Sequence, residues 1–283
     1  EIAQCLVGSE MCIRDRSCIT PEGRKDYLAR GGVILTTGGY GANEAMVDKY
    51  IGPWASRLIV RGSPWITGEN ILMAEEVQAL LVNMDQFYAG PITPTGHCNP
   101  SPLMHAGYGI QVNTKGKRFV PETWLQVPKA KAIAERTEDN RSFMLIGADA
   151  DKNAQILTNT IKRFARLGFE VIKADTIEEA AKKAGVPEKN LVETVREFNA
   201  AVKAGKAKEL DPPYDYDEPH ALETGPFYMI PAAGGMASTF GGPKINKDAQ
   251  VVNFERRPIP GLYAAGAAAG GVWVLSLIHI SEP

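Results

Sequence analysis

Apolar runs that end at glycine, separated by longer segments of helical periodicity, dominate the pattern of hydrophobic and polar positions along the chain. Residues 32–35 form one such run, which leads into Thr36-Thr37-Gly38-Gly39 as a buried parallel strand does at a ligand-facing loop. Residues 261–266 repeat this pattern. Because glycine lets the backbone approach a ligand closely, both loops are candidate binding elements.

Apolar residues recur at helical spacing in several segments. A capping box, Thr176 followed by Glu179, marks the start of one helix, and Gly185 is placed to end it. Pro187 then opens the next helix. The helices predicted in this way cover residues 44–51, 70–82, 151–167, 177–184 and 191–203.

Turn signals separate shorter apolar segments, which predict strands. Thr114-Lys115-Gly116 indicates one hairpin and Lys247-Asp248 a second. Gly, Pro, Thr, Ser and Asn crowd residues 90–102, which indicates an ordered loop or a crossover between domains. The strands predicted cover residues 109–113, 117–120, 143–147 and 227–231, and glycine-rich residues 234–242 are predicted to form a ligand-facing loop.

The charge balance narrows the class of ligand. Lys and Arg number 31 against 33 Asp and Glu, without a block of like charge, so neither nucleic acid nor a membrane surface is an expected partner. A small-molecule substrate is expected instead. Residues 258–280 are long and low in charge, but their Pro, Gly and Ala content favours a buried strand and a cofactor loop over a membrane span.

The two chain ends are related through DNA rather than through folding. Residues 275–283, LSLIHISEP, can be encoded by CTG TCT CTT ATA CAC ATC TCC GAG CCC. The reverse complement of that DNA, in another frame, encodes GSEMCIRD, which is residues 8–15. This DNA word resembles a transposon-type sequencing adapter, so we interpret residues 1–17 and 275–283 as foreign tails on an internal fragment.

The cysteine count changes with that interpretation. Cys5 and Cys12 fall in the foreign segment, which leaves Cys18 and Cys98 in the natural one. Two cysteines make no disulfide framework and fit a reducing compartment. A cytoplasmic location is therefore favoured, and the true N-terminus that would test it is expected to be missing.

Six segments, in their order along the chain, resemble the landmarks of the fumarate reductase and 3-ketosteroid dehydrogenase flavoproteins, the FAD-dependent oxidoreductase 2 family. They are GGVILTTGGYGAN at 31–43, GKRFVPE at 116–122, DTIEEAAKKAGVPEKNLVETVREFNAAVKAGK at 175–206, GPFYMIP at 225–231, GGPKINKDAQVV at 241–252 and PIPGLYAAG at 258–266.

This resemblance implies an α/β fold in which an α+β capping domain is inserted into a partial, Rossmann-like FAD-binding domain. It assigns residues 18–89 and 238–274 to the FAD-binding domain and residues 90–237 to the cap. The chain has no GxGxxG turn, the element that holds the FAD pyrophosphate in the family. The fragment is therefore expected to bind FAD weakly or not at all, and to be inactive by itself.

The resemblance also implies which residues lie at the FAD. For the loop at residues 36–39, the alternative interpretation is a plain strand-to-helix turn. Ala267 stands where the family usually has an acidic residue, and Thr67-Gly68-Glu69-Asn70 differs at two positions from the family's Thr-Gly-Asp-Gly. The candidate cofactor-binding residues are Thr36, Thr37, Gly38, Gly39, Gly68, Tyr263, Ala265 and Gly266.

In the fumarate reductases an arginine after the Arg-Phe-Val-x-Glu segment donates the proton, and other Arg, His and Glu residues bind the dicarboxylate or relay protons. Carried over by motif, the donor falls at Gln126, the relay at His105 and Pro102, and the substrate residues near Gly90 and Ser238. A dicarboxylate needs cationic groups and a proton source. Fumarate is therefore a disfavoured substrate.

An aromatic, nearly uncharged set of residues is expected at the substrate site instead. Such a set suits a neutral enone or ring substrate, with Tyr or His moving the proton while flavin exchanges hydride. Taken singly, each residue also has a purely structural explanation, as a hydrogen-bonded histidine in a loop or a packed tyrosine in a strand. The candidate catalytic residues are Tyr88, His97, His105, Tyr108 and Tyr228.

The leading hypothesis is an FAD-dependent oxidoreductase that moves hydride between flavin and a carbon–carbon bond next to a carbonyl. One alternative is a fumarate reductase-like enzyme that acts on a dicarboxylate or acrylate. The alternative of another class is a non-catalytic fragment that retains only the cap fold. The electron-transfer partner and the direction of the reaction stay open.

Overall fold

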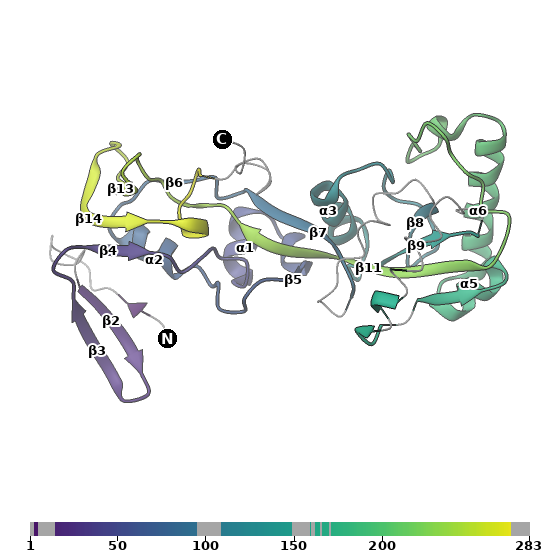
Figure 1. The fold of residues 1–283 in the computed structure, drawn as a ribbon. Helices are drawn as coiled ribbons and strands as arrows, with labels where there is room; N and C mark the ends of the chain where they lie inside the picture. The colour runs from purple at the N-terminus through teal and green to yellow at the C-terminus, as the bar shows by residue number, and fades with distance from the viewer. Residues whose placement is uncertain are drawn as a thin grey trace. The chain divides into compact units, whose positions relative to one another are not determined.

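The structure is a computed structural model that describes residues 3–4, 15–94, 109–148, 159, 162–164, 166–169 and 171–272 (Figure 1). The chain divides into two compact units. The first comprises Glu1–Ser56, Gly62–Tyr88 and Met236–Pro283, and the second comprises Arg57–Arg61 and Ala89–Gly235. The short segment Arg57–Arg61 joins the second unit, which the sequence analysis did not predict.

A mixed three-stranded sheet forms the centre of the first unit. Strand β4 (Val33–Leu35) pairs in parallel with β14 (Pro258–Ala264), with Ile34 opposite Tyr263. Strand β13 (Gln250–Val252) pairs antiparallel with the other edge of β14. One face of this sheet carries a core that includes Leu35, Leu262 and Val251. The strand and loop patterns at 32–39 and 261–266 thus belong to neighbouring parallel strands.

Helices α1 (Glu44–Tyr50) and α2 (Glu69–Glu76) belong to the same unit. Asn43 caps α1 by accepting a hydrogen bond from the Met46 N–H. The prediction of one helix over residues 70–82 is wrong in its second half. Gln78 has a positive φ of 56°, which a helix does not permit, and the chain then forms β6 (Leu81–Val82) against β12 (Gly242–Pro243).

A separate antiparallel sheet of the first unit contains β1 (Ala3–Gln4), β2 (Asp15–Thr20) and β3 (Gly23–Leu28). The side chains of β3 are exposed along its whole length. Strand β1 and the start of β2 lie in the segment interpreted as foreign, an interpretation that rests on its coding sequence. The 3-10 helix η2 (Ala55–Arg57) ends the first stretch of this unit.

A six-stranded sheet forms the second unit, and β11 (Phe227–Thr239) is its longest strand (Figure 1). Strand β11 pairs antiparallel with β9 (Ser142–Ile146) on one side and with β10 (Ile172–Ala174) on the other. Strand β8 (Gly109–Asn113) pairs with β9, and β5 (Ile59–Val60) and β7 (Phe87–Ile92) also pair with β11.

The prediction that a strand ends at Pro231 and is followed by a glycine-rich loop is wrong, because β11 continues through Gly234 and Gly235. A β-carbon at Gly234 would lie 2.6 Å from the Ala130 carbonyl oxygen, and one at Gly235 would lie 2.4 Å from Ile92 Cδ1. These glycines therefore mark close packing on a strand rather than a loop.

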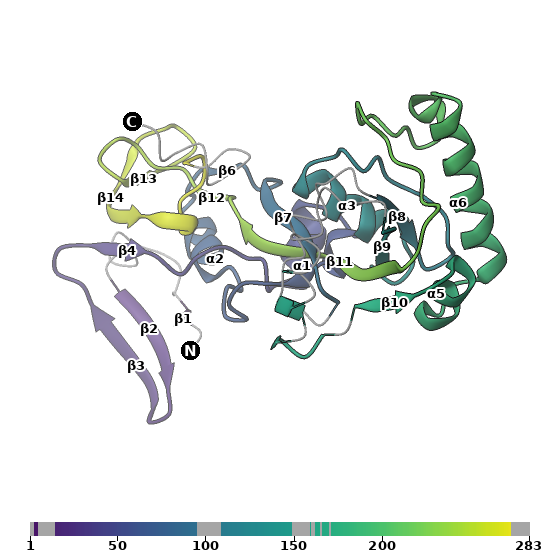
Figure 2. The same cartoon turned by 45° about the vertical axis from the view of Figure 1, so that its right-hand side comes forward.

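The helix pair α5 (Ile177–Ala184) and α6 (Glu188–Lys203) packs side by side in the second unit (Figure 2). The capping prediction is confirmed, since Thr176 Oγ1 accepts from the Glu179 N–H at 3.1 Å. Gly185 ends α5 in the left-handed conformation with φ of 68°. Helix η5 (Ala207–Glu209) follows α6.

Helix α3 (Gln126–Arg136) was not predicted. Its sequence carries Pro128 in the first turn and lysines at positions 129 and 131, so its apolar stripe is short. The predicted turn at Thr114-Lys115-Gly116 is present, but the segment after it pairs only through a single bridge between Val112 and Arg118. The predicted helix at 151–167 falls mostly outside the described residues.

Alternating side chains of the second unit's sheet face two cores. Met229 and Leu145 pack with α5 and α6 on one face, while Ile230 and Met144 pack with Phe164 on the other. Within the described part of the chain, no helix combines the length and the apolar character that crossing a membrane requires. Mixed sheets covered by helices confirm the predicted α/β class.

Candidate functional site

Two predicted loops of the first unit emerge at the same edge of its sheet. Because β4 and β14 are parallel neighbours, their carboxyl ends lie side by side, and the Ala265 N–H donates to the Leu35 carbonyl at 3.1 Å. Thr36 and Thr37 follow β4, and Ala265 and Gly266 follow β14. All four are exposed, so the structure brings these candidate cofactor residues together at a solvent-accessible edge.

The glycines of these loops have different roles. A β-carbon at Gly39 would lie 2.1 Å from Thr239 Oγ1, which itself accepts from the Tyr40 N–H at 3.0 Å. One at Gly68 would lie 2.4 Å from Met46 Sδ, so both glycines are needed for packing within the protein. At Gly266, φ is 66° and no atom lies within 4 Å of the added carbon. This glycine leaves open space in which a ligand can approach the backbone.

Asn70 links helix α2 to the second loop. Its side-chain amide donates to the Ala268 carbonyl at 3.1 Å, where Ala268 ends the 3-10 helix η6 (Gly266–Ala268). The other side-chain atom, Asn70 Oδ1, is buried and has no hydrogen-bond partner among the described residues. An acceptor left over beside an open glycine loop fits a hydrogen-bonding ligand at this edge.

Tyr263 and Gly38 are half-buried, unlike the four exposed loop residues. Tyr263 is opposite Ile34 on the sheet face away from the core, and a β-carbon at Gly32 would lie 3.2 Å from the Tyr263 ring. Gly38, with φ of 85°, sits under the Ile66 side chain. Ile34 is 64% exposed on the same face as Tyr263.

The exposed loop residues and the Asn70 acceptor fit a flavin held largely through backbone groups. The threonine hydroxyls at 36 and 37 can donate or accept hydrogen bonds, and Gly266 permits close contact. Ala267, which is half-buried between Gly266 and Ala268, offers no side-chain acceptor. The first unit therefore presents an edge whose residues fit part of a flavin site, without the GxGxxG turn that holds a pyrophosphate.

The second unit contains a buried ionic cluster just before helix α3. Arg118 binds Glu122 with two parallel hydrogen bonds of 2.9 and 2.7 Å, and the two side chains are 6% and 1% exposed. The Gln111 N–H adds a bond of 3.0 Å to Glu122 Oε1. Arg118 also donates to the Pro212 carbonyl. The landmark GKRFVPE is thus a fold-stabilising motif in this unit.

Lys129 completes this cluster from the first turn of α3. It is 1% exposed, and its Nζ donates to the Glu122 carbonyl at 2.8 Å. The Tyr216 hydroxyl donates to the same carbonyl at 3.2 Å. Burial lowers the pKa of Lys129 to about 8, and the nearby Glu122 carboxylate opposes that shift.

Sequence reasoning missed Lys129 because a lysine in a helix is normally solvated. One signal was available: Lys129 lies one turn before Ile133, a fully buried residue, and so occupies a position on the apolar stripe of α3. This spacing has meaning only within a helix, and α3 was not predicted, so the signal was not recognised.

Two positions carried over by motif meet in the second unit. A β-carbon at Gly90, in β7, would lie 3.1 Å from Gln126 Oε1 at the start of α3. These are the positions at or near which the motif comparison places the proton donor and a substrate-binding residue, and they are neighbours in this unit.

Two of the five predicted catalytic residues, Tyr88 and Tyr228, lie in the described part of the chain. Tyr88 lies in β7 and is half-buried. Tyr228 lies in β11 between Ile146 of β9 and Lys173 of β10, six positions from Gly234. At the usual strand rise of about 3.3 Å per residue, that is roughly 20 Å from the point where α3 packs. His97, His105 and Tyr108 lie outside the described residues.

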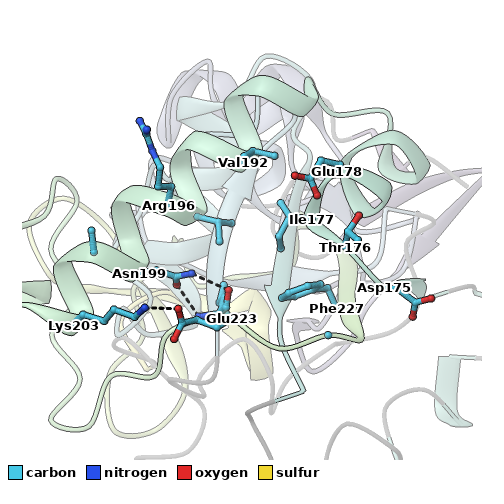
Figure 3. A pocket seen from close by; sticks show the side chains of 14 residues that line it. Asp175, Thr176, Ile177, Glu178, Val192, Arg196, Asn199, Lys203, Glu223 and Phe227 are labelled. Carbon is cyan, nitrogen blue, oxygen red and sulfur yellow. Dashed lines mark hydrogen bonds and ion pairs between the residues drawn. The ribbon is translucent and has the colours of Figure 1, made fainter.

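A groove of about 640 Å³ runs along α5 and α6 and contains none of the predicted site residues (Figure 3). Ile177, Val192 and Phe227 line its floor. The Lys203–Glu223 ion pair and the two hydrogen bonds between Asn199 and the Leu222 backbone satisfy polar groups along its rim. Among the described residues, no group of His, Cys, Asp and Glu side chains has the arrangement of a metal site.

Comparisons with known proteins agree with the geometry of the first unit. A family model described as an FAD binding domain matches residues 9–276. NADH:acrylate oxidoreductase from Vibrio harveyi is 33% identical over 249 residues, which cover 85% of this chain and 24% of that protein.

Two solved structures match the fold. The open conformation of a flavocytochrome c3 fumarate reductase superposes with a TM-score of 0.78 and 27% identity, over 96% of this chain and 46% of that one. The 3-ketosteroid Δ1-dehydrogenase of Sterolibacterium denitrificans superposes with a TM-score of 0.67 and 25% identity, over 91% and 51%.

The chain spans between 24% and 48% of the length of the curated relatives it matches. The resemblance drawn from the six segments is confirmed, and so is FAD as the cofactor of the family. On the matched range, the sheet edge and the superposed folds, the chain belongs to the FAD binding domain family.

Proposed function

We propose that this chain is part of an FAD-dependent oxidoreductase that transfers hydride between flavin and a carbon–carbon bond next to a carbonyl. The observation that carries the proposal is the pair of exposed loops at the carboxyl ends of β4 and β14, within a chain of the FAD binding domain family. We assign the first unit to the FAD-binding domain and the second to the cap.

Five residues of the first unit would hold the flavin. Thr36, Thr37, Ala265 and Gly266 offer exposed backbone and hydroxyl groups, and Asn70 offers its unpaired oxygen. When bound, flavin supplies the hydride chemistry. The protein's part is to orient the ring and to exclude water from it.

For the substrate we propose a neutral enone or ring compound. At the positions where dicarboxylate reductases place charged groups, this chain has Gln126, Gly90 and Ser238, and Gln126 contacts the Gly90 position directly. An amide beside a glycine offers hydrogen bonds and space but no charge for a carboxylate. The fold match to a ketosteroid dehydrogenase supports the same class.

A carboxylate-bearing substrate such as an acrylate is the second candidate. It is favoured by the 33% identity to NADH:acrylate oxidoreductase and by Lys129, a buried cation one helical turn from Gln126. For the compartment, the cysteine content leads us to propose a reducing one.

Competition between the two substrate classes tests the proposal. The purified chain is mixed with excess FAD, photoreduced without oxygen, and given either a steroid enone or acrylate while flavin reoxidation is followed. We expect any reoxidation above the rate of free reduced FAD to occur with the enone only. Faster reoxidation with acrylate would contradict the neutral substrate, and no acceleration by either would favour the non-catalytic fragment over the proposed activity.

A further inference from the structure

Lys129 is a buried cation in a place that disfavours a positive charge. It lies in the first turn of α3, where the helix dipole is positive, and its side chain is 1% exposed. An ordinary core position on this stripe would carry an alanine or leucine. The α3 residues around it, Ala130, Ala132 and Ile133, follow that rule.

The carboxylate beside Lys129 already has other hydrogen-bond partners. Both oxygens of Glu122 are already bound by Arg118, and the Gln111 N–H binds one of them as well. The lysine donates instead to the Glu122 backbone carbonyl, which also accepts from the Tyr216 hydroxyl. The charged and titratable groups that face Lys129 include Glu122 and Tyr216.

The Glu122 carbonyl begins the segment that leads into α3. Between Glu122 and Gln126 the chain has no side-chain cap to hold it, because Leu125 at the helix start makes no capping hydrogen bond. The two donors to the Glu122 carbonyl instead anchor the segment before the helix. Gln126, at the other end of this segment, lies against Gly90.

We propose that Lys129 is a positioning residue that, in its charged form, holds residues 122–126 and thereby sets the place of Gln126 at the substrate site. The identification of Gln126 with that site rests on the proposed function, whereas the hold on the segment does not. An ammonium group makes a stronger hydrogen bond to a carbonyl than a neutral amine does. Loss of the proton therefore loosens the segment.

The indole of Trp124 reports directly on this segment. Trp124 lies two residues after Glu122, and its ring stacks under Arg136 of α3 at 5.3 Å. The experiment is a pH titration of the whole chain by NMR, with the Trp124 indole signal assigned from the Trp124→Phe variant. We expect the signal to shift with a midpoint near pH 8.

Variants separate a titrating lysine from a merely buried one. Lys129→Met should lose the midpoint, and Lys129→Arg should lose it while keeping the signal that the unsubstituted chain shows at low pH. Lys131→Met, an exposed lysine on the same helix, should leave the midpoint unchanged. If the methionine variant does not fold, Lys129→Gln must lose the midpoint in its place.

A constant Trp124 signal between pH 7 and 9 in the unsubstituted chain would overturn the proposal. So would a midpoint that survives in the Lys129 variants. The titration needs neither flavin nor substrate, so its outcome is independent of the reoxidation experiment, and either proposal can fail alone.

Discussion

The candidate flavin edge of the first unit, formed by the loops after β4 and β14, and the ionic cluster of the second unit are built from different kinds of groups. The edge relies on backbone, glycine and exposed hydroxyl groups, with no charged side chain among Thr36, Thr37, Ala265 and Gly266. The cluster buries three charged side chains: Arg118 and Glu122 form an ion pair, and Lys129 donates to the Glu122 carbonyl. Substitutions at the exposed edge should therefore change the free energy of unfolding little, whereas removing one partner of a buried charge pair should lower it strongly.

The largest effect is expected where the buried ion pair is broken. Arg118→Met leaves the Glu122 carboxylate buried without its partner, which should lower the free energy of unfolding by about 3–5 kcal/mol. Chemical denaturation followed by circular dichroism measures this. Glu193→Gln removes the exposed Lys117–Glu193 pair as a control and should cost under about 1 kcal/mol. Equal costs for the two variants would contradict the comparison.

The second effect is the pH dependence that Lys129 gives to stability. In the unfolded chain the lysine stays protonated up to its ordinary pKa of 10.5, but in the folded chain only up to about 8. The unfolded state binds more protons between these values, so stability rises with pH there, by roughly 3 kcal/mol in all. Below pH 8 the cost of burying the charge lowers the free energy of unfolding by its full amount.

The difference between the unsubstituted chain and Lys129→Met isolates that contribution. Burial raises the pKa of Tyr40 and of Tyr214, which would lower stability at still higher pH in both proteins alike. Urea denaturation at pH 7, 8.5 and 10 should therefore show the free energy of unfolding of the unsubstituted chain rising relative to that of Lys129→Met as pH rises. Parallel curves would show that Lys129 does not titrate in this window.

Gly39→Ala should destabilise the first unit by about 2 kcal/mol, because its β-carbon would overlap Thr239 Oγ1. Thr239→Ala removes that oxygen, so the same glycine substitution should cost less in the Thr239→Ala background. A double-mutant cycle by thermal denaturation measures the coupling. Additive effects would mean that the two loops do not pack as described.

The smallest effect on stability is expected at Gly266. Its φ of 66° costs an alanine about 1 kcal/mol, but no protein atom stands in the way. Gly266→Ala should instead weaken flavin binding, because the methyl group would occupy the space left for the ligand. Flavin fluorescence quenching tests this, and unchanged binding would place the flavin elsewhere.

Sequence analysis predicted the two strands at the candidate flavin edge and the loops that follow them because their cause is local. A strand that runs into Thr-Thr-Gly-Gly, and a second that runs into Ala-Ala-Gly, need only their own residues to be recognised. The helices α5 and α6 were found for the same reason, through the Thr176 cap and Gly185.

The parts that were missed depend on contacts far along the chain. Gly234 and Gly235 resemble a loop until Ala130 and Ile92 are seen to pack against them. Lys129 resembles a solvated lysine until the Glu122 carbonyl is found beside it.

Hydrogen exchange of the chain with and without saturating FAD tests the central claim most directly. Because the GxGxxG turn is absent, we expect purified protein to retain little or no flavin absorbance and to need a large excess of FAD. The account predicts added protection in peptides covering residues 36–39 and 264–268, with none along α5 and α6. Protection confined to the groove of α5 and α6, or none at any FAD concentration, would contradict it.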